Sequence, residues 1–185
     1  MKIHRIRHMF RFHIITLFPD LFKSYCSTSI IGRGCSSGAV KIELFNPRDF
    51  CTDKYRRVDD TPYGGGAGMV MKPEPVFAAF EAIQRLSSSP VIITSPRGQT
   101  LTQKLAHELA QTQENELTII CGHYEGMDER ISTLATHQIS LGDFVLTGGE
   151  LRFGQIGHPD YFSQSVSGFP IVAVADDKLQ LHLTR

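Results

Sequence analysis

The sequence predicts an α/β domain built on a largely parallel sheet. Short runs rich in β-branched residues recur along the chain with helical segments between them, an alternation typical of parallel sheets. Three of these runs, 90–94, 117–121 and 137–146, each lead into a polar loop that contains glycine. Ligands bind at the carboxyl ends of strands in open α/β sheets. We therefore expect these three loops to meet at one binding site.

The amino-terminal part is expected to contain two strands and one helix. Residues 12–18 are predicted as the first strand, and Pro19-Asp20 opens a helix that runs to about residue 25. Residues 39–45 are predicted as the second strand, which ends at the turn-forming pair Asn46-Pro47.

Apolar residues at helical spacing predict the remaining helices. Residues 75–86 begin with proline in the first turn, and four of their apolar residues fall on one core-facing side: Val76, Ala79, Phe80 and Ile83. Residues 102–111 carry Leu105 and Leu109 four positions apart, which indicates a helix. A further helix with Ile131 and Leu134 is expected after the loop at 122–130.

The bulk composition indicates one domain without a global electrostatic field. A chain of 185 residues with 41% hydrophobic content can bury one sizeable core. With 19 basic and 19 acidic residues, only local basic patches could bind a polyanion. One such patch lies within 48–57 and another within 2–11, and we treat residues 1–8 as an extension ahead of Met9. The alternative for each patch is an ordinary solvated surface.

The cysteines and the hydropathy pattern indicate the cellular compartment in which we expect the protein. Cys26, Cys35, Cys51 and Cys121 show no CxxC spacing, so no metal site or redox motif is expected. No apolar run approaches the roughly 18 residues of a membrane span, and the first residues lack the core of a signal peptide. We expect a soluble cytoplasmic protein with reduced thiols and no membrane partner.

The segment 58–75 is the most distinctive part of the chain. It contains Gly64, Gly65, Gly66 and Gly68, and glycine lets the backbone take positive φ and approach a ligand closely. The alternatives are a flexible connector and a loop network of ion pairs between residues 59–60 and 56–57. Neither GxGxxG nor GxxxxGK[ST] occurs, so classical dinucleotide and triphosphate sites are not predicted.

The three loops at the strand ends offer the groups that an adenosine needs. Backbone donors, acceptors and apolar edges suit a purine ring held in an apolar slot. His123 and Tyr124 have two interpretations, as acid–base groups or as packing residues. The acidic residues at 128–129 suit a helix start whatever the function.

Five segments in order carry a family resemblance: ITLFPDLF, NPRDFCTDKYRRVDDTPYGGGAGMVMKPEP, ITSPRGQTLTQ, IICGHYEGMDERI and ISLGDFVLTGGEL. They resemble the bacterial tRNA (guanine-N1-)-methyltransferases, TrmD, of the SPOUT superfamily, and they extend from Phe10 to about Leu151. The resemblance implies a SPOUT-type fold with a deep trefoil knot, in a methyltransferase domain that spans 9–162. It further implies methyl transfer from S-adenosylmethionine to N1 of the guanine just 3′ of the anticodon of a tRNA, by a homodimer.

The resemblance also implies roles for individual residues. The cofactor would be bound by Ser95, Pro96, Gly122, Tyr124, Glu125, Gly126, Leu141, Gly142, Asp143, Phe144, Val145, Leu146, Gly148 and Gly149. The tRNA side would hold Arg57, Asp59, Gly64, Gly65 and Gly66.

The resemblance ends after Leu151. Residues 152–159 contain two glycines and a proline, where the family has an apolar helix that completes the knot. The family's helical carboxyl-terminal domain is not matched by 163–185, which we expect to form one or two strands. Asp177 falls at about the family's distance for the catalytic base, but its surroundings match nothing in the family, so the catalytic residue stays unassigned.

The unusual tail leaves two main functional interpretations open. The chain is either an active methyltransferase or a truncated or frame-shifted, catalytically inactive fragment that keeps only cofactor or RNA binding and dimerisation. The segment 141–149 favours the enzyme, and the unmatched motifs after Leu151 favour the fragment. A third interpretation, an unrelated nucleotide-binding domain that uses the loop at Gly64, requires the ordered motifs to be accidental.

Overall fold

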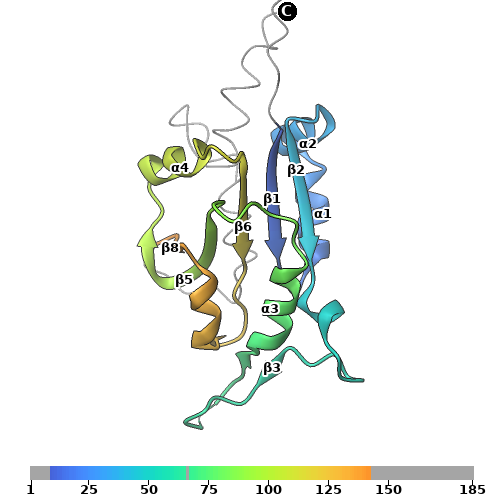
Figure 1. Cartoon of the computed structure of the whole chain (residues 1–185), viewed down its shortest axis with the longest axis vertical. Helices are drawn as coiled ribbons and strands as arrows, with labels where there is room; N and C mark the ends of the chain where they lie inside the picture. Colours follow the sequence, from blue (N-terminus) through green and yellow to red (C-terminus); the bar gives the residue numbers. More distant parts are fainter. Residues whose placement is uncertain (1–8, 66, 143–185) are drawn as a thin grey trace, which may run out of the picture.

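The chain folds around a five-stranded parallel sheet, seen in a computed structural model that describes residues 9–65 and 67–142 (Figure 1). The strand order is β2-β1-β6-β5-β8 and every pair is parallel. The strands are β1 (Phe10–Ile15), β2 (Val40–Phe45), β5 (Val91–Thr100), β6 (Glu116–Ile120) and β8 (His137–Ser140). This confirms the predicted α/β class.

The central strands are buried because helices cover both faces of the sheet. Every residue of β6 is buried, as are five of the six residues of β1, which is the apolar pattern of parallel strands with two covered faces. One face packs on α1 (Pro19–Cys26), α2 (Ser29–Ser36) and α4 (Gln103–Ala110). The other packs on α3 (Pro73–Glu81) and the 3-10 helix η2 (Glu129–Leu134).

The two faces have separate cores because side chains alternate along each strand. Phe12 and Ile14 lie in the core below α1, α2 and α4, together with Phe22 and Leu105. Ile15 of β1 and Ile120 of β6 lie in the core below α3 and η2. Three residues of the predicted helix face are buried in the same core: Val76, Ala79 and Ile83.

Most predicted elements are confirmed, with shifts at their ends. The helices at α1 and α4 and the strands at β2 and β6 match their expected ranges to within about two residues. The first strand is shifted, since it begins at Phe10 and ends at Ile15. The third helix begins two residues early and ends at Glu81. Ile131 and Leu134 lie in a 3-10 helix rather than in an α-helix.

Two features were not predicted. Helix α2, with the sequence SIIGRGCS, was missed because two glycines and two serines are poor helix formers. A second, three-stranded sheet has the order β3-β4-β7, formed by β3 (Asp59–Asp60), β4 (Val70–Met71) and β7 (Gly126–Met127). It joins the glycine-rich loop to the segment that follows β6.

Several expectations fall on residues outside the described part of the chain. These are the extension at 1–8, Gly66, the end of the last predicted strand at 143–146, the closure of the knot and the tail at 163–185. Within the residues that the structure describes, no helix is long and apolar enough to cross a membrane.

Candidate functional site

Three of the predicted loops meet at one edge of the sheet. In the β5–β6 pair Ile93 lies opposite Ile120, and in the β5–β8 pair Thr94 lies opposite Ile139. Parallel neighbours are about 4.8 Å apart, so the chain leaves Thr94 and Ile120 at the same edge of the sheet, and Ser140, the last residue of β8, lies opposite Thr100 beyond the bulge of β5. The expected convergence of the three loops is therefore confirmed for the described residues.

Thr94 joins the first two loops. Its buried hydroxyl accepts a hydrogen bond from the amide of Gly122 at 3.3 Å and lies 3.5 Å from the carbonyl oxygen of Ile120, to which it donates. A Cβ atom on Gly122 would lie 3.2 Å from Cε of Met127 and 3.4 Å from the carbonyl oxygen of Thr94. A larger residue at Gly122 would therefore require the Met127 side chain to shift.

The segment Ser95–Gly98 bulges out of the sheet between two stretches of pairing. Ile139 lies opposite both Thr94 and Gln99, so the register shifts around the intervening residues. Gly98 returns against β8 so closely that a Cβ atom would lie 2.5 Å from the backbone of Gln138. The predicted loop is therefore a bulge within β5, with Ser95 half-buried and Pro96 exposed.

Aromatic rings line the loop that follows β6. The His123 ring lies 4.8 Å from the rings of Phe18 and Tyr124, with edge-on geometry in both pairs. The Tyr124 hydroxyl lies 3.4 Å from Nη2 of Arg48, which can donate to it. Tyr124 has a positive φ of 60°, a strained conformation that persists where surrounding contacts demand it. These contacts favour the packing interpretation of His123 and Tyr124.

Glu125 links the expected cofactor site to the glycine-rich loop. Its Oε2 accepts a hydrogen bond from the amide of Met69 at 2.7 Å, and its own amide donates to the Met69 carbonyl at 3.2 Å. Gly68 has a φ of 94°, and a Cβ atom there would overlap the Glu125 carboxylate. Only glycine is compatible with both this backbone conformation and this contact.

Arg130 makes a second connection to the same loop. Its Nη2 donates to the Tyr63 hydroxyl at 3.0 Å, and its guanidinium pairs with Asp128 at 2.9 Å. The hydrogen bond from Arg130 lowers the pKa of Asp128, and Asp128 in turn raises the pKa of Arg130. Sequence reasoning missed this pair, although the acidic residues before Arg130 were read as a helix start.

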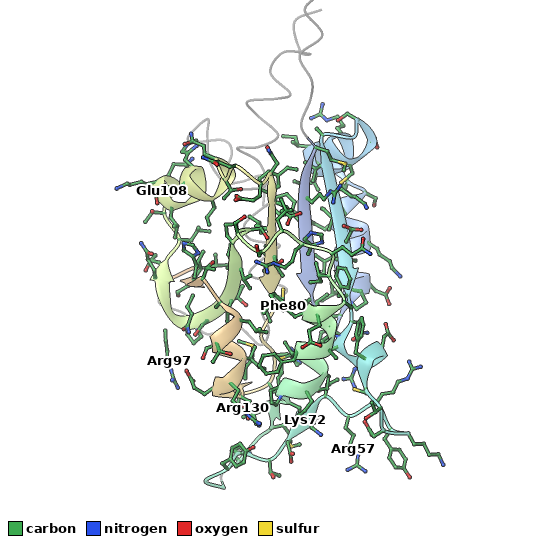
Figure 2. All side chains as sticks on the ribbon, viewed as in Figure 1. Arg57, Lys72, Phe80, Arg97, Glu108 and Arg130 are labelled. Atoms are coloured by element: carbon green, nitrogen blue, oxygen red, sulfur yellow. The ribbon has the colours of Figure 1, made fainter. Side chains whose placement is uncertain are left out.

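The residues expected on the tRNA side lie on an exposed, polar segment. Asp59 is half-buried in β3, Gly64 and Gly65 are exposed, and Gly65 has a φ of 71°. Arg57 lies at the end of the molecule that also carries Lys72 and Arg130 (Figure 2). The proposed ion-pair network is wrong for the described residues, because Arg56 pairs with Asp49 at 3.4 Å.

The expected cofactor site lies only partly within the described residues. A Cβ atom on Gly126 would meet nothing within 4 Å. The other half is Asp143, Phe144, Val145, Leu146, Gly148 and Gly149, which with Asp177 lie outside the described residues. Within residues 9–65 and 67–142, no group of three His, Cys, Asp or Glu residues could hold a metal ion.

A cavity of about 670 Å³ lies at the other end of the sheet. It is lined by Arg11, Arg85 and Glu116, among others, and by none of the expected site residues. Its walls mix both signs of charge and come from the amino ends of β1 and β6. Because ligands of open α/β sheets bind at the carboxyl ends of the strands, the carboxyl edge and not this cavity is the candidate site.

Comparison with known proteins gives consistent matches. Residues 10–156 match the family described as tRNA (Guanine-1)-methyltransferase TrmD. The chain is 53% identical over 141 residues to a tRNA (guanine-N(1)-)-methyltransferase of Nostoc sp., covering 76% of this chain and 56% of that relative. The corresponding protein of Synechocystis sp. is 52% identical, with 76% and 60% covered. The chain thus spans a little more than half the length of these curated relatives.

A solved structure is also similar to this fold. It is the crystal structure of the tRNA (m1G37) methyltransferase from Aquifex aeolicus, with a TM-score of 0.73 and 36% identity. The similarity covers 91% of this chain and 69% of that chain.

Proposed function

Because the chain belongs to the TrmD family of tRNA (guanine-1)-methyltransferases, we propose that it transfers a methyl group from S-adenosylmethionine to N1 of the guanine 3′ of the anticodon. The observation that carries the proposal is the contact between Glu125, in the loop that follows β6, and the backbone of the glycine-rich loop at Met69. It brings the expected cofactor half and the expected RNA half of the site within one hydrogen bond of each other.

The cofactor half is proposed to lie at the carboxyl edge of β6, β5 and β8. S-adenosylmethionine supplies an electrophilic methyl group when it is bound. Gly126 leaves open space beside the backbone, and Ser95 and the backbone of the three loops would supply hydrogen-bonding groups. We propose that residues 141–149 complete this half by closing the family's trefoil knot, and that two copies of the chain form a homodimer.

The RNA half is proposed to lie on the segment that contains β3 and the glycine-rich loop. Arg57 supplies positive charge for the phosphate backbone, while Asp59 and the glycines 64–66 approach the target nucleotide. Holding the two reactants in line can supply on the order of 7–11 kcal/mol of the barrier. Guanine N1 must lose its proton, and a positioned base contributes roughly 10²- to 10⁴-fold.

A catalytically inactive, cofactor- and RNA-binding protein is the second candidate. It is favoured by the sequence after Leu151, where residues 152–185 do not match the family's arginine and aspartate motifs. Binding without turnover is the signature that separates this candidate from the first.

One experiment separates the two candidates. The purified full chain would be titrated calorimetrically with S-adenosylhomocysteine, and the same sample assayed for methyl transfer to a tRNA transcript with guanine 3′ of the anticodon. A transcript with adenine at that position is the matched control. Binding with guanine-dependent turnover supports the enzyme, binding without turnover supports the inactive protein, and the absence of binding contradicts both.

A further inference from the structure

Tyr55 is an exposed aromatic residue without a role in either core. Its side chain is 69% exposed and lies between the 3-10 helix η1 (Pro47–Phe50) and β3. Exposing a large ring to water is unfavourable, but a single exposed aromatic side chain is common in folded proteins and needs no explanation. The surroundings of Tyr55 make this case different.

The turn that carries Tyr55 is held by hydrogen bonds rather than by packing. The Asp53 carboxylate accepts hydrogen bonds from the amides of Tyr55 and Arg57, each at 3.1 Å. The Asp53 carbonyl accepts from the amide of Arg56 at 3.1 Å, and Nη1 of Arg48 donates to the Arg56 carbonyl at 3.5 Å. The ring is thus presented to solvent on a braced turn, which lowers the ordering cost of binding a partner.

Basic groups surround the exposed ring. The Arg57 guanidinium carbon lies 5.1 Å from the ring centroid and Nζ of Lys54 lies 5.9 Å from it. The same turn carries Arg56, and Arg48 connects the turn to Tyr124 of the site. An exposed ring among cations is the arrangement by which proteins bind unpaired RNA bases, with stacking on the ring and phosphates at the cations.

Tyr63 is a second exposed tyrosine, but unlike Tyr55 it has a structural partner. Its ring is 90% exposed, but its hydroxyl accepts a hydrogen bond from Arg130, so it has a structural partner that holds the glycine-rich loop. The contacts of Tyr55 are instead with flexible cations from its own turn. A nucleobase can stack on this ring while the cations move to the adjoining phosphates.

We propose that Tyr55 is an RNA-binding residue on which one unpaired base of the anticodon loop stacks, with Lys54 and Arg57 at the flanking phosphates. The inference rests on the proposed function, because it takes the anticodon loop as the ligand. It adds a binding residue, outside the cofactor site and the glycine-rich loop, that determines where the loop is held on the protein.

The first test measures the affinity of the full chain for a tRNA transcript over a range of salt concentrations. Tyr55→Ala should weaken binding about 5- to 150-fold without changing the slope of log K against log salt. Tyr55→Phe keeps the ring and should bind within about twofold of the unaltered protein. Arg57→Gln should instead reduce the slope by about one unit.

These variants separate stacking from other roles of Tyr55. A lower salt slope in Tyr55→Ala would mean that the ring only positions the cations, and equal losses in Tyr55→Phe and Tyr55→Ala would assign the effect to the hydroxyl. Unchanged affinity in Tyr55→Ala would overturn the proposal. Thermal unfolding is the folding control, since a side chain this exposed should leave the melting temperature nearly unchanged.

A second test locates the base directly. Transcripts that carry 5-iodouridine at single positions of the anticodon loop would be irradiated in complex with the protein, and the cross-linked peptide identified by mass spectrometry. We expect a cross-link to Tyr55 from one loop position, and no cross-link to Tyr55 from any position would contradict the proposal. RNA binding and cross-linking without methyl transfer would reject the proposed activity and leave this inference standing.

Discussion

The two halves of the candidate site are held by different kinds of interaction. At the sheet edge, Ile93 and Ile120 are at most 2% exposed and each is paired with a neighbouring strand. In the segment 51–69, Tyr55 and Tyr63 are more than two-thirds exposed, and polar contacts such as the two hydrogen bonds between Met69 and Glu125 hold the chain in place. Burial therefore determines one half of the site, and a few polar contacts determine the other.

This difference has a functional consequence. A buried sheet edge opens only when a large part of the domain unfolds, whereas an exposed segment with few contacts opens locally at low cost. On the proposed assignment, the cofactor half is the more rigid one and the RNA half can adapt to a large ligand. Substitutions should accordingly affect global stability in the first half and RNA binding in the second.

Ile120→Ala should have the largest effect on stability. Ile120 is completely buried beside Ile15 and Ile93, and it directly precedes the loop with Gly122. The cavity left behind should lower the free energy of unfolding by about 2–5 kcal/mol, measured by urea denaturation. Leu21→Ala, at a side chain that is 56% exposed, is the control and should change it by less than about 0.5 kcal/mol. Equal effects of the two substitutions would contradict the distinction between the halves.

Gly68→Ala should instead impair function with little change in stability. The new Cβ atom would overlap the Glu125 carboxylate on a backbone with a φ of 94°, so the carboxylate must leave the Met69 amide or the loop must shift. We expect methyl transfer to fall roughly 10- to 100-fold, while calorimetry shows unchanged binding of S-adenosylhomocysteine. Gly38→Ala is the matched control, because Gly38 also has a positive φ, of 72°, but a Cβ atom there meets nothing within 4 Å. Equal losses in both variants would show that the contact with Glu125 is irrelevant.

Arg130→Gln tests the second connection to the glycine-rich loop. The substitution removes the ion pair with Asp128 and the hydrogen bond to Tyr63. The Arg130 side chain is 55% exposed, so the loss of these contacts should lower tRNA affinity only about threefold, measured by a filter-binding titration. Lys104→Gln, at a side chain that is 87% exposed on α4, should leave affinity unchanged. A loss of tRNA affinity as large as the loss of methyl transfer expected for Gly68→Ala would mean that Arg130 contacts the RNA itself.

The smallest expected effect lies far from the site, in β2. Nζ of Lys41 lies 2.9 Å from Oε1 of Glu43. The hydrogen bond that Lys41 donates is the main cause of the lowered pKa of Glu43. Because the folded-state pKa is depressed, this contribution to stability is present above the ordinary pKa of glutamate and is lost as the pH falls through the folded-state value. Lys41→Met should therefore reduce stability by less than about 1 kcal/mol at neutral pH and by nothing in strong acid. Urea denaturation at several pH values measures the difference, and a constant difference would refute this assignment.

The fold was largely predictable because its main signal is local. The apolar strands at 90–94 and 117–121 and the helical face with Val76 and Ala79 are buried as their patterns indicate. The missed helix α2 shows where this logic fails. Gly32 is a poor helix former, but a Cβ atom there would lie 2.5 Å from the carbonyl oxygen of Ser27, so the packing of α1 against α2 requires glycine at this position.

The candidate site was predictable only in part. The convergence of the loops after β6, β5 and β8 followed from strand order, and the family resemblance indicated Ser95, Gly122 and Glu125. The hydrogen bond between Arg130 and Tyr63 was not predicted, because the sequence around each residue does not indicate its distant partner. The ion pair of Arg56 was assigned to the wrong carboxylate for the same reason, since several acidic residues lie close to it in the sequence.

The sequence by itself indicated the strands of the five-stranded sheet and most of its helices, the apolar faces that form the two cores and the loops of the candidate site. These features follow from periodicity and burial, which each segment encodes on its own. Only the tertiary structure decided that Glu125 holds Met69, 56 positions away, and that Arg130 holds Tyr63, 67 positions away. Contacts at such separations depend on how the completed sheet places its loops, and a directional hydrogen bond forms only once that geometry exists.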